Sequence, residues 1–435
     1  MKPIIIYSDF ISNRLTYTLD VIFKHVLFID YNLVTKKEFL KDSNDVKINY
    51  SIESLEDSIQ VTPHQILSET DLQEYSPEVC YFKDIPYIFN TASDNSINYD
   101  LFASIFYMVS RYEEYFKTDL DPHERFRAEN SLAFKNNFLE KPIVNIWIKE
   151  LKTLIETKYP DYKFPKKKYQ YINSIDIDLA YSYKGKSKGL LVSSFIKNLL
   201  QGNTDELKNK LAFFTKKIED PYDTYAVFKN INEKYKKANL FFIQVGNYGK
   251  FDKNLHHKSP KFQNLIKELH QENEIGLHPS YASNKNPQLI GVEKKRLEHI
   301  LGEKIIKSRQ HFLKLHFPET YENLIHEGIE HDYTMGYASK IGFRAGICHP
   351  FPFFNLKTNE QRNLMLHPFQ IMDGTLNGYM QLTPDQALEK SKKIINNVKA
   401  VEGTFVSLWH NSSLSEQNEW KNWKRVYTEL VGFAQ

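Results

Sequence analysis

The chain has 435 residues, of which 41% are hydrophobic and 14% aromatic, and its formal net charge is +3. This length predicts two domains, and the near balance of charge argues against a nucleic-acid partner. Cys80 and Cys348 are the only cysteines, which argues against a disulfide framework or a thiolate zinc site. No apolar stretch has the length of a membrane span or of a signal-peptide core, so we expect a soluble, cytoplasmic protein.

The first third of the chain predicts a smaller α/β domain, residues 1–165, whose role the sequence does not indicate. Its apolar residues have strand-like and helical spacing in turn. The predicted elements are a strand at 3–7, an amphipathic segment at 15–26, and helices at 101–116 and 142–158. The stretch 159–168 is rich in Lys, Tyr and Pro, which is typical of a connector.

From residue 170 to 435 the pattern changes to an alternation of strands and helices, which predicts one α/β barrel or a close relative of it. The predicted strands are 171–177, 240–245, 274–277, 342–347 and 404–409. The predicted helices are 189–217, 222–237, 260–272, 288–300, 318–327, 385–399 and 417–433.

Polar side chains follow the ends of three of these strands. Asp176 and Asp178 close one strand, His278 closes another, and His410 closes the last. Alternation places the two carboxylates on one face, where like charges need a counter-charge, a metal or a shared proton. Each residue alone could equally be a solvated or structural strand-end residue. Catalytic groups of α/β barrels come from the carboxyl ends of several strands, so the joint pattern favours an active site.

Four short motifs, in this order, resemble those of the polysaccharide deacetylases, carbohydrate esterase family four. They lie at 174–178 (SIDID), 274–278 (EIGLH), 308–312 (SRQHF) and 405–410 (FVSLWH). The resemblance covers about residues 170–435 and implies a distorted (β/α) barrel of the polysaccharide-deacetylase type. Three further stretches, 110–115, 333–338 and 342–346, resemble a divergent branch of that family with its own leading domain.

The resemblance also implies roles for the residues at strand ends. Asp176 would be the general base, Arg309 the group that pairs with it, and His410 the general acid. Asp178 and His278 would bind a divalent metal, for which zinc is the expected ion.

The sequence departs from the family at one metal ligand. The family carries another histidine four residues after the first, where this chain has Ala282. A catalytic zinc site normally has three protein ligands, so a third ligand must come from elsewhere if the site binds metal. We predict His311, two residues after Arg309, and regard the tandem His256 and His257 as weaker candidates.

The predicted function is therefore the metal-dependent removal of an acetyl group from a sugar or polysaccharide, and the favoured substrate carries an N-acetyl group. Trp409 and Tyr281 are candidates to stack on sugar rings. Three alternatives remain open: a metal-independent amidohydrolase, a non-catalytic glycan-binding or assembly protein, and a glycoside hydrolase that uses Asp176 and Asp178. Two carboxylates on one strand are poorly placed for the last reaction. The sequence does not indicate an oligomeric state.

Overall fold

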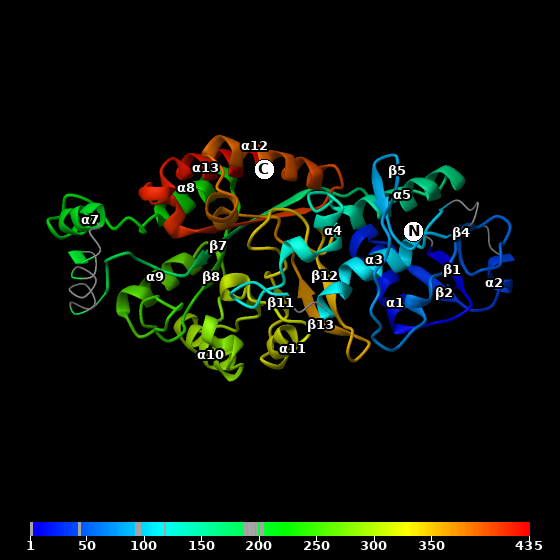
Figure 1. The fold of residues 1–435 in the computed structure, drawn as a ribbon, viewed down its shortest axis with the longest axis horizontal. Coiled ribbons are helices and arrows are strands. Elements are labelled where there is room, and N and C mark those ends of the chain that lie inside the picture. The colour runs from blue at the N-terminus through cyan, green and yellow to red at the C-terminus, as the bar shows by residue number, and fades with distance from the viewer. Residues whose placement is uncertain are drawn as a thin grey trace.

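The computed structural model describes residues 3–41, 45–91, 97–116, 119–186, 189, 196, 199–200 and 204–435. The protein is elongated, with a small sheet near one end and a larger sheet beside it (Figure 1). No helix in these described ranges is long and apolar enough to cross a membrane.

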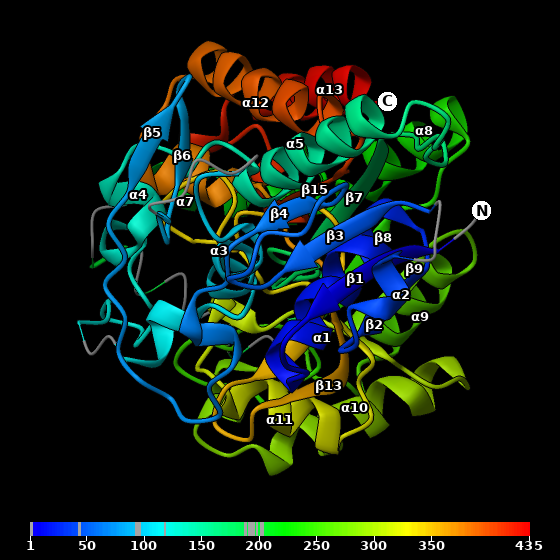
Figure 2. The ribbon, with the colours of Figure 1, turned by 90° about the vertical axis from the view of Figure 1, so that its right-hand side faces the viewer.

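The N-terminal part contains a four-stranded parallel sheet in the order β2-β1-β3-β4. Its strands are β1 (Ile4–Ser8), β2 (Tyr31–Val34), β3 (Lys47–Tyr50) and β4 (Ile59–Val61). The other elements of this part are the helices α1 (Asn13–Leu19), α2 (Glu38–Lys41), α3 (Leu101–Val109), α4 (Leu132–Lys135) and α5 (Ile143–Lys158), and a hairpin of β5 (Cys80–Phe82) and β6 (Ile85–Tyr87). Figure 2 shows this sheet in front of the larger one, with α5 above it.

The helix predicted over 101–116 is interrupted. It ends at Val109, and Arg111 adopts a left-handed backbone with φ 54° before a short 3-10 turn, Tyr112–Tyr115. The interruption points the buried Arg111 side chain at two carboxylates, Glu113 and Glu114, which a continuous helix would not bring together.

The larger sheet has nine strands in the order β12-β13-β11-β10-β9-β8-β7-β15-β14. All neighbouring strands are parallel except β12 and β13, which are antiparallel. The strands are β7 (Gln170–Ile177), β8 (Leu240–Ile243), β9 (Glu274–Leu277), β10 (Lys307–Ser308), β11 (His331–Asp332), β12 (Phe351–Asn355), β13 (Glu360–Leu366), β14 (Ile371–Met372) and β15 (Thr404–His410). The predicted mixed α/β class with a parallel sheet is confirmed.

The strand order itself is open, with β12 and β14 at its two ends, so strand pairing alone does not close the predicted barrel. One continuous segment, from β13 to β14, nevertheless pairs with strands near both ends of the strand order. Its first part, β13, pairs with β11, and its last part, β14, pairs with β15. Between them His367 donates its backbone N–H to Asp332, and Gln370 donates to Val406.

Among the described residues, the helices that accompany the larger sheet are α7 (Thr204–Phe214), α8 (Tyr225–Tyr235), α9 (Pro260–His270), α10 (Gln288–Leu301), α11 (Glu319–His326), α12 (Pro384–Lys399) and α13 (Trp423–Ala434). The helix predicted over 189–217 lies partly outside the described residues, and its described portion is α7. The helix predicted over 417–433 begins only at Trp423, because Asn422 has a positive φ angle and separates it from the 3-10 turn Asn418–Trp420.

The strand predicted over 342–347 does not form. Gly342 and Gly346 have φ angles of 127° and 67°, and the backbone between them bonds to the N-terminal part instead of a strand. Phe343 donates its N–H to the Leu139 carbonyl, and Val144 donates to the Gly346 carbonyl, each at 2.9 Å. We call this contact between the stretch 342–346 and the N-terminal part the seam. A Cβ at Gly342 would lie 2.4 Å from the Leu139 oxygen, so the seam requires glycine at this position.

A buried ionic cluster lies at the same seam. Glu114 bonds to Arg111 at 2.8 Å and to Arg344 at 2.9 Å, and all three side chains are almost fully buried. Burial alone would raise the pKa of Glu114, but the two guanidinium groups outweigh it and lower that pKa. Arg111 also donates to the Tyr337 hydroxyl. The stretches 110–115, 333–338 and 342–346 therefore meet in space and join the two parts of the chain.

Candidate active site and metal centre

The carboxyl ends of four strands, β15, β7, β9 and β10, bring the predicted site residues together, and β8 lies between β7 and β9. His410 of β15 is in register with Asp176 of β7, which is in register with Phe242 of β8. Asp178 and His278 lie one residue beyond Ile177 and Leu277, the last residues of β7 and β9. Arg309 follows β10 directly, and His311 lies two residues after Arg309. All six predicted polar residues thus meet at one edge of the sheet.

Asp178, His278 and His311 form a cluster that can hold a metal ion. One ligand atom from each lies within 4.8 Å of the other two. The Nε2 atoms of His278 and His311 lie 3.1 and 3.5 Å from the two oxygens of Asp178. Ligands 2.0–2.2 Å from a tetrahedral zinc ion are about 3.4 Å apart, so these separations fit such an ion.

A second feature of Asp178 agrees with a metal site. Its Oδ1 atom is buried and has no hydrogen-bond partner within the described part of the chain. A buried carboxylate oxygen without a partner is costly, by about 1–3 kcal/mol or more. A cation at the centre of the cluster would satisfy it.

The hydrogen bonds behind the two histidines direct their Nε2 atoms toward Asp178. His278 Nδ1 contacts the Arg309 carbonyl oxygen, which can only accept, so this nitrogen carries the proton. His311 Nδ1 contacts Asp252 Oδ1 at 2.9 Å and donates in the same way. Such carbonyl and carboxylate partners fix the tautomer of metal-binding histidines.

Asp252 is a site residue that the sequence did not reveal. It lies in the polar loop after β8, where periodicity carries no signal, and only its position after a strand end could have drawn attention to it. Its buried carboxylate also accepts the N–H of Tyr281 at 2.8 Å. Burial alone would raise the pKa of Asp252, but the hydrogen bond from His311 and its other partners lower it.

The same contacts govern the proton on His311. Burial alone would lower the pKa of His311, but the charges of Asp178 and Asp252 outweigh burial and raise that pKa to about 9. In the metal-free protein the imidazole of His311 is therefore doubly protonated at neutral pH, with the second proton on Nε2. A metal ion must displace this proton, so metal binding strengthens as the pH rises toward 9.

Asp252→Asn is expected to weaken metal binding by about 10–100-fold, the usual effect of removing a carboxylate behind a metal-binding histidine. The substitution keeps the shape of the side chain but removes the charge that orients His311. Titration of the metal-free protein with a competing zinc indicator measures the change. Asp385→Asn, on the exposed start of α12, is the control and should leave the affinity unchanged; an equal loss in both variants would contradict this role of Asp252.

Arg309 fixes the carboxylate of Asp176. It donates from Nη1 to Asp176 Oδ1 at 2.8 Å, from Nη2 to Ser174, and from Nε to the Tyr333 carbonyl. Its guanidinium lies 4.5 Å from the centre of the Phe242 ring. The other oxygen of Asp176 lies 3.6 Å from His278 Nε2 and so faces the metal-binding cluster.

His410 also approaches Asp178. Its Nε2 is 3.6 Å from Asp178 Oδ2, and its Nδ1 bonds to Asp373 at 2.8 Å. Asp373 is fully buried and also accepts from the His410 backbone and from Ser413. Asp373 was not predicted, because it follows β14, a two-residue strand that periodicity cannot detect.

The prediction that Trp409 stacks on a sugar is wrong. Trp409 is 0% exposed and packs edge-on against Tyr427 of α13 at 5.0 Å. The physical reason is the alternation of side chains along β15: His410 faces the site, so its neighbour faces the helices. Tyr281 is half-buried beside Phe251 and Phe312, next to the metal-binding cluster.

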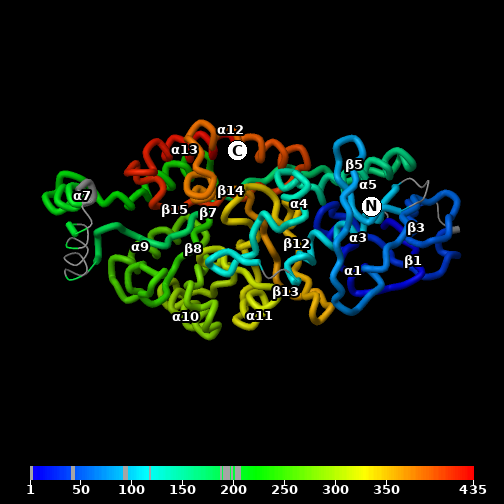
Figure 3. Tube along the Cα trace, in the orientation of Figure 1, coloured from blue at the N-terminus to red at the C-terminus, as the bar shows by residue number. Residues whose placement is uncertain are grey.

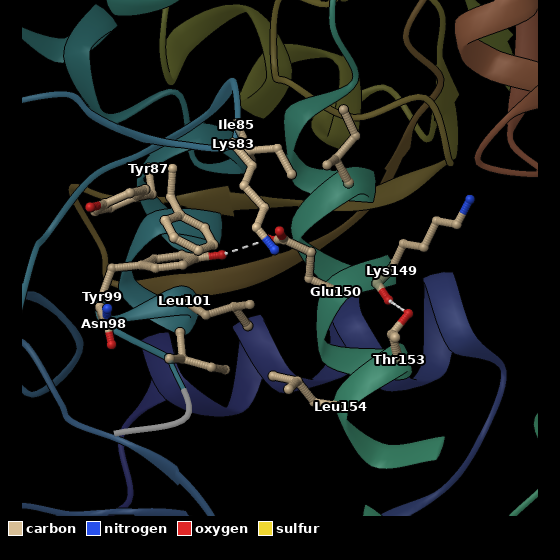
Figure 4. Close-up of a pocket in the computed structure, with 13 residues that line it drawn as sticks. Lys83, Ile85, Tyr87, Asn98, Tyr99, Leu101, Lys149, Glu150, Thr153 and Leu154 are labelled. Carbon is tan, nitrogen blue, oxygen red and sulfur yellow. Dashed lines mark hydrogen bonds between the residues drawn. The ribbon is translucent and has the colours of Figure 1, made fainter. Parts of the chain in front are cut away.

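A separate cavity of about 690 Å³ lies in the N-terminal part, between the β5–β6 hairpin, α3 and α5 (Figure 4). Its lining is mainly apolar, and the Tyr99 hydroxyl donates to Glu150 across it at 3.2 Å. Burial raises the pKa of Glu150. Its lining contains neither a histidine nor a pair of carboxylates, so we do not assign the reaction to it.

Comparison with known proteins gives weak likenesses. A family model described as "Family of unknown function (DUF7033)" matches residues 4–160. No curated protein matches the chain. A solved structure from Mycobacterium smegmatis, proposed to be a polysaccharide deacetylase, is 13% identical with a TM-score of 0.41, and the match covers 62% of this chain and 86% of that one.

Two further solved structures are less similar. The match to a polysaccharide deacetylase from Bacillus cereus covers 61% of this chain and 88% of that one, at 11% identity and a TM-score of 0.30. The match to a CE4 family pseudoenzyme from Bacillus anthracis covers 61% of each chain, at 9% identity and a TM-score of 0.30. At this level of similarity they do not decide what this chain does.

Proposed function

We propose that the chain is a metal-dependent hydrolase that removes an N-acetyl group from a sugar or polysaccharide, on a distorted (β/α) barrel of the polysaccharide-deacetylase type. One observation carries the proposal. The Asp178–His278–His311 cluster lies next to two further groups: the carboxylate of Asp176, which an arginine holds, and the imidazole of His410, which a carboxylate holds. A set of this kind supplies metal ligands, a base and an acid at one point.

The three cluster residues would hold a divalent ion, and zinc suits one carboxylate and two imidazole ligands best. When bound, such an ion polarises a carbonyl group and acidifies water. His278 and His311 offer Nε2 atoms whose opposite nitrogens are already engaged, so little reorientation is needed on binding.

Asp176 would act as the general base. Its Oδ2 atom faces the cluster, while Arg309 holds Oδ1. This arrangement leaves one oxygen to take a proton from the attacking water as the new C–O bond forms. The hydrogen bond from Arg309 also fixes the orientation of the carboxylate, and a general base must be held within reach of the proton that it takes.

His410 would act as the general acid, with Nε2 delivering a proton to the leaving nitrogen as the C–N bond breaks. The products are then acetate and a free amine. Burial alone would lower the pKa of His410, but the charges of Asp373 and Asp178 outweigh it and raise the pKa to about 10. In the metal-free protein His410 therefore holds a proton throughout the neutral range, and Asp373 stays beside it when Asp178 binds an ion.

Asp373→Asn is expected to move the alkaline limb of the pH dependence of kcat/KM to lower pH by about 1–3 units, the effect of one adjacent opposite charge. The sign follows from the raised pKa: His410 donates only below its pKa, and loss of Asp373 lowers that pKa. Ser413→Ala, which leaves the Asp373 carboxylate in place, should shift the limb little. If the alkaline limb is the same in Asp373→Asn and in the unmodified enzyme, His410 is not the general acid.

The arrangement favours deacetylation over a glycoside hydrolase mechanism. Both Asp176 and Asp178 approach the same atom, His278 Nε2, at 3.6 and 3.1 Å. Carboxylates gathered on one atom do not flank a scissile bond from two sides, as glycosidases require. A glycan-binding protein without activity would need no buried partners behind Asp176 and His410.

The experiment that tests the function is acetate release from N-acetylated chito-oligosaccharides by the full chain. We expect release that stops after chelation and returns on addition of zinc. Release that continues in chelated, metal-free protein would support a metal-independent amidohydrolase, and binding of the sugar without release would support the non-catalytic alternative.

A further inference from the structure

A short loop of the N-terminal part reaches the segment 312–314, which directly follows the proposed metal ligand His311. The loop, residues 121–125, is closed at its base by an antiparallel bridge between Leu120 and Phe126. Figure 3 shows this cyan stretch leaving the N-terminal part and crossing toward the loops of the larger sheet. The contact is made by three consecutive side chains, His123, Glu124 and Arg125.

The segment after His311 has a backbone conformation that its side chains disfavour. Phe312 and Leu313 have φ angles of 61° and 53°, in the left-handed region that bulky residues rarely adopt. Such a conformation costs free energy, and it persists only where the surrounding contacts impose it. Because it begins at the residue next to His311, the contacts that impose it also fix the backbone of this ligand.

Arg125 supplies the most direct of these contacts. Its Nη1 donates to the Phe312 carbonyl at 2.8 Å, and its Nη2 donates to the Tyr379 hydroxyl at 2.9 Å. Its Nε donates to Asp121 at 2.7 Å, and Asp121 also accepts the backbone N–H of Arg125 at 3.0 Å. Arg125 is 7% exposed. Its guanidinium is therefore held in one orientation, from which it bonds to the left-handed backbone.

The two residues before Arg125 extend the contact. Glu124 forms an ion pair with Lys314, whose side chain is 2% exposed, so water competes little for the lysine. The ring of His123 lies 4.7 Å from the ring of Phe312. A carbonyl, a ring and a charged group of the segment 312–314 are thus each held by the N-terminal part.

This restraint differs from the one that Asp252 supplies. Asp252 bonds to Nδ1 of His311 and so orients the imidazole ring. The backbone N–H of His311 donates to the Pro279 carbonyl at 3.2 Å, which holds the chain before the ring. The chain after the ring is the part that the loop 121–125 contacts. The ligand is therefore restrained by three separate groups, of which one belongs to the N-terminal part.

We propose that residues 123–125, which we call the clamp, position His311 for metal binding. They are positioning residues, since none of them belongs to the metal-binding cluster. The inference rests on the metal site of the proposed function and deepens it by assigning a task at that site to the N-terminal part. The clamp lies within residues 4–160, the region that the family of unknown function matches.

The test compares the zinc affinity of Arg125→Gln and Arg127→Gln in the full chain, by titration of the metal-free protein with a competing zinc indicator. Glutamine at position 125 is too short to reach the Phe312 carbonyl. Arg125→Gln should weaken zinc binding by at least about tenfold, the lower end of the effect of removing support behind a metal ligand.

Arg127→Gln is the matched control. Arg127 lies two residues further along the chain, but it bonds to Asp119 and to the Leu120 carbonyl, away from the metal-binding cluster. This variant should keep the affinity of the unmodified chain. Glu124→Gln, which weakens the pair with Lys314, should lower the affinity by less than Arg125→Gln and serves if Arg125→Gln does not fold.

Hydrogen exchange of the metal-free protein, measured by mass spectrometry, separates positioning from a general loss of stability. Arg125→Gln should speed exchange in the peptide 311–316 and leave β7 and β15 as in the unmodified chain. Faster exchange throughout the chain would show a structural role alone and would overturn the proposal. So would faster exchange in 311–316 with an unchanged zinc affinity, because the clamp would then not act on the ligand.

The clamp and the proposed function can fail separately. If the unmodified chain binds no zinc, the metal centre and the task of the clamp fall together. If it binds zinc with an affinity that does not depend on Arg125, only the clamp falls. If zinc binding depends on Arg125 but no acetate is released, the proposed reaction falls and the clamp stands.

Discussion

Asp176→Asn is expected to lower the rate of acetate release by at least about 100-fold while the metal content stays the same. General base catalysis contributes about 10²–10⁴-fold, and an amide cannot take the proton from water. Asp176 lies against Arg309 and only its second oxygen faces the cluster, so it is not needed to hold the ion. Steady-state kinetics and elemental analysis of the same preparation measure both quantities.

Asp178→Asn provides the comparison, because it should lose metal and activity together. Asp385→Asn, exposed on α12, should lose neither. Equal metal loss in Asp176→Asn and Asp178→Asn would show that Asp176 is also a metal ligand. Full activity in Asp176→Asn would show that Asp176 is not the general base.

Glu114→Ala is expected to lower the free energy of unfolding by about 3–5 kcal/mol, the usual effect of breaking a buried ion pair. The substitution removes the anion that Arg111 and Arg344 share. Arg111 keeps Glu113, whereas Arg344 becomes a buried cation whose other hydrogen bond goes to the Gly336 carbonyl. Equilibrium denaturation in urea, followed by circular dichroism, measures the loss.

Glu129→Ala is the matched control for this change. Glu129 and Lys340 form an ion pair across the same seam at 3.4 Å, but both side chains are well exposed. Exposed pairs contribute about 0–1 kcal/mol, so this variant should remain close to the unmodified protein. Equal stability of the two variants would show that the buried cluster does not hold the seam.

The sequence predicted which polar residues meet at the strand ends better than it predicted the elements around them. Asp176, Asp178, His278 and His410 were found because they follow strands long enough to show an apolar pattern. β10, β11 and β14 are two residues long, too short for any periodicity. For that reason Asp373, which follows β14, was missed, and His311 was found only through the resemblance and the missing ligand at Ala282.

Other errors follow from long-range contacts that no local pattern encodes. The stretch 342–347 has strand-like composition, but its backbone bonds to Leu139 and Val144, about two hundred residues earlier. Trp409 is different, because alternation along the strand already places it opposite His410. Its burial could have been predicted once His410 was assigned to the site.

The metal content of the full chain tests the account most directly. Elemental analysis after purification in zinc-containing buffer and removal of free metal should find about one zinc per chain, the content of a single three-ligand site. The His311→Ala variant should contain little, because two ligands remain. A full complement of zinc in His311→Ala would contradict His311 as a ligand, and a fully active chain without metal would contradict the metal centre itself.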